Sequence, residues 1–104
     1  MKTPRGSGPR KVDPKARQEA ATALAITALS FVAADPEHLG RFLSLTGIGP
    51  ESIRAAAREP GFLLGVLDYV AGDEALLLAF ANQNDFDPED VSRARAALAD
   101  VEIT

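Results

Sequence analysis

Residues 20–34 read AATALAITALSFVAA, fifteen consecutive positions without a charged side chain. Glu19 precedes this run and Asp35 follows it, and every later apolar segment of the chain is shorter. A helix that is apolar on nearly all sides is usually buried on nearly all sides. We therefore expect a central apolar helix over about residues 14–34, wrapped by the other helices of the domain.

Small side chains recur within this run at steps of three and four, namely Ala20, Ala23, Thr27, Ser30 and Ala34. Such spacing keeps residues on one side of a helix. The stripe should therefore let a neighbouring backbone come close, while bulky side chains on the rest of the surface supply hydrophobic area.

The run also has two membrane-related interpretations. It is shorter than the ~20 apolar residues that a membrane span needs, so we predict no span. A secretory signal peptide is the second interpretation, because basic residues precede the run and the small residues before Asp35 resemble a cleavage site. The long leader, with Asp13, Glu19 and three prolines, favours instead the core helix of a cytoplasmic protein.

Length and composition favour one domain without covalent or metal staples. The chain has 104 residues, no cysteine and a net charge of −4, which excludes disulfide frameworks, cysteine-based zinc sites and thiol nucleophiles. The charge is uneven: residues 1–19 carry a net +4 and residues 20–104 a net −8. The protein is thus an acidic body with a basic tail.

Proline and glycine divide the body into helices. Residues 1–12 are rich in Gly, Pro and cations and are predicted to be a disordered basic tail, and residues 13–104 a single helical domain. Asp-Pro pairs mark helix starts, and Gly47 and Gly72 mark helix ends. The expected helices span about 14–34, 36–46, 51–58, 62–71, 75–81 and from 88 onward. No segment has the alternation typical of strands, so we predict an all-α compact bundle of five to six short helices around the central helix, with no sheet.

One segment resembles a known DNA-binding element. Residues 39–56, LGRFLSLTGIGPESIRAA, are similar to the helix-hairpin-helix of DNA-repair and replication proteins. In that family, backbone N–H groups of the hairpin approach a DNA phosphate and nearby cations assist. The residues carried over by this resemblance are Gly47, Ile48, Gly49, Arg54 and Arg58.

Two positions depart from the helix-hairpin-helix pattern. Thr46 stands where proline is common, and Glu51 stands where a cation would help; the acidic body also disfavours phosphate binding. The alternative is a tight turn that only joins two helices and needs the same glycines and proline for local reasons. Both interpretations stay open.

Other functional signals are weak. The tail could contact nucleic acid, anionic lipid or the chain's own acidic surface through four cations, namely Lys2, Arg5, Arg10 and Lys11. His38, the only histidine, is expected to be a solvated helix residue. We predict no catalytic residues, no cofactor-binding residues and no metal ligands. An enzyme would need a cleft that gathers two carboxylates, or His38 with one.

Most of residues 20–100 resembles a family of small helical proteins from alphaproteobacteria that is known as a domain of unknown function (DUF3572-like). The most distinctive pieces are Leu29-Ser30-Phe31 with Asp35-Pro36, Gly47-Ile48-Gly49-Pro50 and Gly72-Asp73-Glu74. The resemblance implies a bacterial cytoplasmic protein and transfers no catalytic residue.

The polar residues form no convergent acid, base or ligand set. The leading hypothesis is therefore an uncharacterised, non-enzymatic helical module that binds an unknown protein partner and is a monomer or weak homodimer. The alternative is weak, sequence-independent DNA binding through Gly47 to Arg58.

Overall fold

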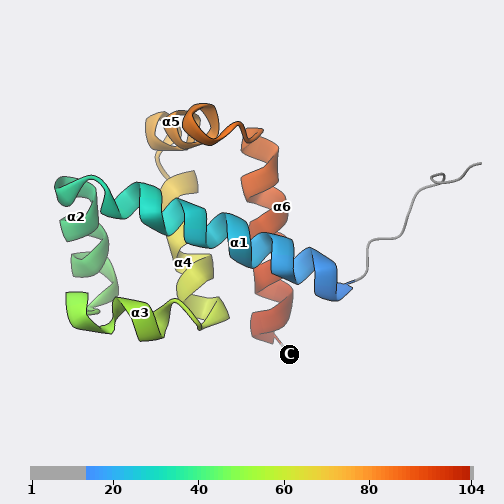
Figure 1. Ribbon diagram of the computed structural model, residues 1–104, viewed down its shortest axis with the longest axis horizontal. Helices are drawn as coiled ribbons and strands as arrows, with labels where there is room; N and C mark the ends of the chain where they lie inside the picture. The colour runs from blue at the N-terminus through green and yellow to red at the C-terminus, as the bar shows by residue number, and fades with distance from the viewer. Residues whose placement is uncertain (1–13, 104) are drawn as a thin grey trace, which may run out of the picture.

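The structure, a computed structural model, describes residues 14–103 (Figure 1). The predicted tail and its cations Lys2, Arg5, Arg10 and Lys11 lie outside the described residues. The helices are α1 (Pro14–Ala33), α2 (Pro36–Thr46), the 3₁₀ turn η1 (Pro50–Ser52), α3 (Ile53–Ala56), α4 (Pro60–Ala71), α5 (Glu74–Asn84) and α6 (Pro88–Ile103). The described part of the chain contains no strand, and the predicted all-α bundle is confirmed.

Aspartate side chains fix where helices begin. Asp35 precedes α2 and accepts a hydrogen bond from the N–H of Glu37 at 3.0 Å. Asp73 precedes α5 and accepts from the N–H of Leu76 at 3.2 Å. Each bond satisfies an N–H group that has no partner inside its own helix, which is typically worth about 1 kcal/mol. Asp87 makes the equivalent bond to the N–H of Glu89 at 3.2 Å, at the start of α6.

Two left-handed residues fix where helices end. Gly47 has φ +75° and donates its N–H to the carbonyl of Leu43 at 2.8 Å, which closes α2 as its sequence predicts. Asp85 has φ +59° and closes α5. The sequence did not indicate this second ending, because aspartate adopts the left-handed region less often than glycine.

The third helix differs from its prediction. We expected one helix over residues 51–58, but the structure has a three-residue 3₁₀ turn followed by the four-residue α3. Neither element contains a fully buried residue, and Ile53 and Ala57 are only partly buried against the core. Short helices depend on tertiary packing for stability, so this weakly packed segment forms only short turns.

The most fully enclosed helix is α4. It packs against α1, α5 and α6 and lies behind α1 in Figure 1. Its buried side chains, each 1% exposed or less, are Leu63, Val66, Leu67 and Val70. Burying each of these large side chains stabilises the fold by roughly 1.5–3 kcal/mol. Helix α4 therefore forms the centre of the core.

The prediction that α1 is buried on nearly all sides is wrong for one side. Its inner side is buried against α4 and α6, where Ala25 and Ala28 are 0% exposed. The opposite side is open, and Figure 1 shows no element in front of it. Alanine, serine and threonine made the run uncharged without making it strongly hydrophobic, so exposure of this side is tolerated.

Helix α5 shows a similar difference. Its sequence ALLLAFA (75–81) is apolar on all sides and predicts a second interior element, but only Leu76, Phe80 and Ala81 are buried, and Leu78 is 46% exposed. Helix α5 caps one end of the bundle instead (Figure 1). Within residues 14–103, no helix combines the length and hydropathy required to cross a bilayer.

Candidate functional site

The open side of α1 is the most unusual surface of the molecule. We define the outer face of α1 by a set of exposed or half-exposed residues on one side of the helix, namely Ala16, Ala20, Ala23, Ile26, Thr27 and Ser30; the exposed Glu19 borders this face near Ile26. Most of the small stripe that the sequence predicted to receive a neighbouring backbone lies on this face, yet no helix within residues 14–103 covers it (Figure 1).

The outer face of α1 is less polar than its hydroxyl groups suggest. The Thr27 hydroxyl donates to the carbonyl of Ala23 at 3.0 Å within the same helix. This bond satisfies the hydroxyl locally and leaves the threonine methyl group as an apolar surface. Ile26 is one of three large hydrophobic side chains that are strongly exposed in the described residues, at 44%.

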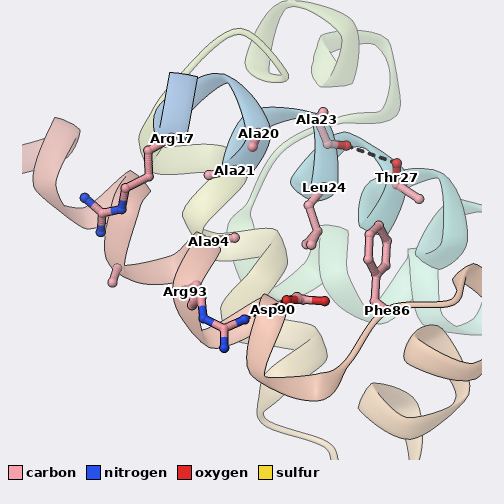
Figure 2. Close-up of a pocket in the computed structure, with 11 residues that line it drawn as sticks. Arg17, Ala20, Ala21, Ala23, Leu24, Thr27, Phe86, Asp90, Arg93 and Ala94 are labelled. Atoms are coloured by element: carbon pink, nitrogen blue, oxygen red, sulfur yellow. Dashed lines mark hydrogen bonds and ion pairs between the residues drawn. The ribbon is translucent and has the colours of Figure 1, made fainter. Parts of the chain in front are cut away.

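A groove of about 770 Å³ runs along one flank of this face, between α1 and α6. We call it the α1–α6 groove. Figure 2 shows Arg17 at one end and Phe86 at the other, with Asp90 and Arg93 on the α6 side. Its floor is apolar and includes Leu24, which is 8% exposed.

The charged residues beside the α1–α6 groove are already paired. Arg93 contacts Asp90 at 2.7 Å and Glu89 at 3.3 Å. Arg17 lies 3.7 Å from Asp100. All of these side chains are at least 37% exposed, and pairs of this kind contribute about 0–1 kcal/mol. What the groove offers a ligand is therefore mainly apolar area.

A second groove, of about 530 Å³, follows the other flank of α1. We call it the Pro60 groove, after the residue at the start of α4 that lines it together with Thr22, Ile26, Leu98 and Val101. The outer face of α1 is thus a ridge with an apolar groove on either side. The uncharged stripe in the sequence marks this surface, but its pattern alone predicts burial and not exposure.

A polar cleft of about 410 Å³ lies at the corner where α1, α2 and α5 meet. Its lining includes Asp35, His38 and Asp73, residue types that acid–base chemistry could use. The prediction that His38 is solvated is wrong: the ring is half-buried, and its Nδ1 lies 3.0 Å from the Tyr69 hydroxyl. The sequence gave no signal for this contact, which joins α2 to α4 across 31 positions.

The groups in this cleft are engaged in structural roles. Asp35 and Asp73 each accept the capping hydrogen bond of a helix. No ion pair between His38 and either carboxylate is recorded in the described residues. Across residues 14–103, no three His, Asp or Glu side chains gather closely enough to hold a metal ion. The cleft can bind a small polar group, but its acid and base candidates are not in contact.

The hairpin residues lie at the edge of the bundle. Gly47 donates its N–H to Leu43, and Ile48 donates its N–H to the Thr46 hydroxyl at 3.3 Å, so both N–H groups are used internally. The Glu51 carboxylate lies over Gly49, since an ideal Cβ on that glycine would be 2.7 Å from the Glu51 Oε2 atom. This turn therefore carries a negative charge, which disfavours a phosphate beside Gly49.

The two arginines carried over with the hairpin are both exposed. Arg54 is on α3 and Arg58 follows it. They share the short segment after the turn, but the turn presents a carboxylate beside them. Phosphate contact at these positions stays a prediction.

Comparisons with known proteins identify the family of this chain. Neither the curated proteins nor the solved structures contain a match to it. One family model, described as a protein of unknown function (DUF3572), matches residues 18–101, from α1 to the last turns of α6. The match covers more than half of the chain and confirms the resemblance found over residues 20–100. The chain therefore belongs to the DUF3572 family.

Proposed function

We propose that this chain is a non-enzymatic protein-interaction module whose docking surface is the outer face of α1. The observation that carries the proposal is a stretch of fifteen residues, 20–34, that has no charge although much of it is exposed. Exposed helix faces of folded proteins normally carry charged and polar side chains. A face without them makes few favourable contacts with water, so little hydration free energy is lost when a partner covers it.

The shape of this surface also supports docking. Small side chains along a ridge let a second helix come close, and the two flanking grooves can receive larger side chains from it. Peptide recognition by a helix lying in an apolar groove uses the same arrangement. We propose that this binding takes place in the cytoplasm, which is the location that the sequence favours.

The absence of enzymatic activity is part of the proposal. In the polar cleft, Asp35 and Asp73 serve as helix caps and His38 is held by Tyr69. A general base needs hydrogen-bond reach to the proton it removes and a partner that orients it for that step. Here the contact with Tyr69 orients the His38 ring where α2 packs against α4, which is a structural role.

Site-specific crosslinking tests the proposed function. A photoreactive amino acid replaces Ala23, at the middle of the outer face of α1, in the full chain expressed in cells. The matched control carries the same group at Ser92, an exposed residue on the outer side of α6. We expect protein adducts from position 23 and none above background from position 92. Equal yields from the two positions, or no adduct from either, would contradict the proposal.

DNA binding through Gly47 to Arg58 is the second candidate. It is favoured by the exposure of Arg54 and Arg58 beside the turn, and opposed by the internal bonds of Gly47 and Ile48. Titration of duplex DNA at low salt, followed by backbone amide signals, tests it. Shifts at Gly47 and Gly49 would support the hairpin mode, shifts confined to residues 1–17 would indicate the tail, and no shifts would exclude both.

A further inference from the structure

The outer face of α1 has features that fit a second copy of itself. We infer that two copies of the chain associate through this face, with the two α1 helices antiparallel about a two-fold axis near Ala23. This inference rests on the proposed function and names its partner. It concerns the ridge formed by α1 and the Pro60 groove.

The spacing of small residues suits a pair of helices. From Ala16 to Ala34 the small exposed or half-exposed residues recur at alternate steps of four and three. This spacing keeps them on one side of the helix, where a second helix can contact several of them. Alanine along the seam between two helices allows a close approach, near the lower end of the usual separation of about 8–10 Å.

Two-fold symmetry brings the same flank of each α1 together. In an antiparallel pair the axis is perpendicular to both helices, so each flank of α1 meets the same flank of the other copy. Ile26 lies on the flank that borders the Pro60 groove. With the axis between positions 23 and 24, Ile26 of one copy lies at the level of position 21 in the second copy. The exposed Ile26 side chains of the two copies therefore lie on the same flank of the pair and add apolar area to the contact.

The charges at the two ends of α1 are complementary in this arrangement. The first turn of α1 contains Lys15 and follows a basic segment, whereas its last turn leads into Asp35 and Glu37. Antiparallel pairing places the basic start of one helix beside the acidic end of the other, which favours this orientation over a parallel one. No charged residue lies within 20–34, so like charges do not meet along the seam.

The available area indicates a reversible dimer. Helix α1 has 20 residues, so it is ~30 Å long. A face ~10 Å wide then provides about 300 Å² per copy, against about 800 Å² per partner in stable complexes. We therefore expect an equilibrium that is seen at high protein concentration and lost on dilution.

Single cysteines test the contact directly, since the chain has no cysteine of its own. A disulfide requires Cα atoms within about 4.4–6.8 Å of each other. Ala23→Cys lies next to the axis and should form a covalent dimer under mild oxidation. Ser92→Cys, at a position on α6 that is also exposed, is the matched control and should stay monomeric. Equal crosslinking of the two variants would overturn the inference.

A mixing experiment tests the antiparallel order. In the proposed pair, Ala20 of one copy faces Thr27 of the other. Ala20→Cys and Thr27→Cys should therefore crosslink rapidly when mixed and slowly when each is alone. Faster crosslinking of Ala20→Cys with itself would indicate a parallel pair and contradict the proposed geometry.

Sedimentation equilibrium of the full chain measures self-association without a covalent crosslink. We expect a monomer–dimer equilibrium whose dissociation constant rises at least about tenfold in Ala23→Glu and is unchanged in Ser92→Glu. Circular dichroism of both variants checks that they remain folded. A monomer at every concentration would overturn the inference.

The outcomes separate this inference from the proposed function. If the crosslinker at Ala23 captures a second copy of the chain, both stand. If it captures a different protein and the purified chain is monomeric, the proposed function stands and the inference fails. If it captures nothing and the chain is monomeric, both fail.

Discussion

The outer faces of α1 and α6 are both exposed to solvent, but they are built differently. On α6, the exposed side carries Glu89, Arg93 and Asp100, and Arg93 bridges two carboxylates at 2.7 and 3.3 Å. On α1, the exposed side has no charge over residues 20–34. Both helices bury an opposite side against α4.

The α6 face is explained by the solvent that it meets. Charged side chains at steps of three and four keep the helix hydrated and add a few tenths of a kcal/mol per pair. The exposed alanines of the α1 face favour the helix itself, but they offer water neither charge nor hydrogen-bonding groups. Two exposed helix faces of one molecule thus differ in composition, and the uncharged face of α1 is the better candidate for binding a partner.

The largest expected effect distinguishes the two sides of α1. Ala28 is 0% exposed, so Ala28→Glu places an unpaired charge in the core and should destabilise the fold by more than about 3 kcal/mol. Ala23→Glu, on the outer face, should change stability by less than about 0.5 kcal/mol. Urea unfolding followed by circular dichroism measures both. Similar losses in the two variants would show that the outer face is covered, and the comparison would fail.

The helical fold could be predicted from the sequence because its signals are local. Asp35 and Asp73 cap helices through hydrogen bonds that span only two or three positions, and Gly47 ends α2 through its own backbone. Such contacts depend little on the rest of the molecule. The short α3 was overestimated, since its length depends on tertiary contacts that it does not make.

The candidate site could be predicted only in part. The stripe of small residues was recognised, but the sequence gives no measure of whether Ala23 faces a neighbour or water. An uncharged helix side has the same pattern in both cases. The contact between His38 and Tyr69 was missed because it depends on how α2 crosses α4, which no periodicity encodes.

A smaller effect is expected on α6. Arg93→Ala removes both ion pairs of an exposed arginine and should cost at most about 1 kcal/mol, with no change in self-association. The loss should shrink at high salt, where exposed charges are screened over about 3 Å at 1 M. Thermal unfolding at low and high salt measures it. A loss that does not depend on salt would mean that Arg93 acts by packing, and that the α6 face is not purely a solvated surface.

The smallest effect on stability comes from making the α1 face resemble that of α6. The double variant Ala16→Glu with Ala20→Lys places a Glu and a Lys four positions apart on exposed sites, in the favourable order. We expect it to change the stability of the monomer by no more than about 0.5 kcal/mol, and to abolish both the dimer and the adducts at position 23. Urea unfolding and sedimentation report the two quantities separately. If the variant still associates, then binding does not require an uncharged face. The α1 face would in that case be equivalent to the charged face of α6.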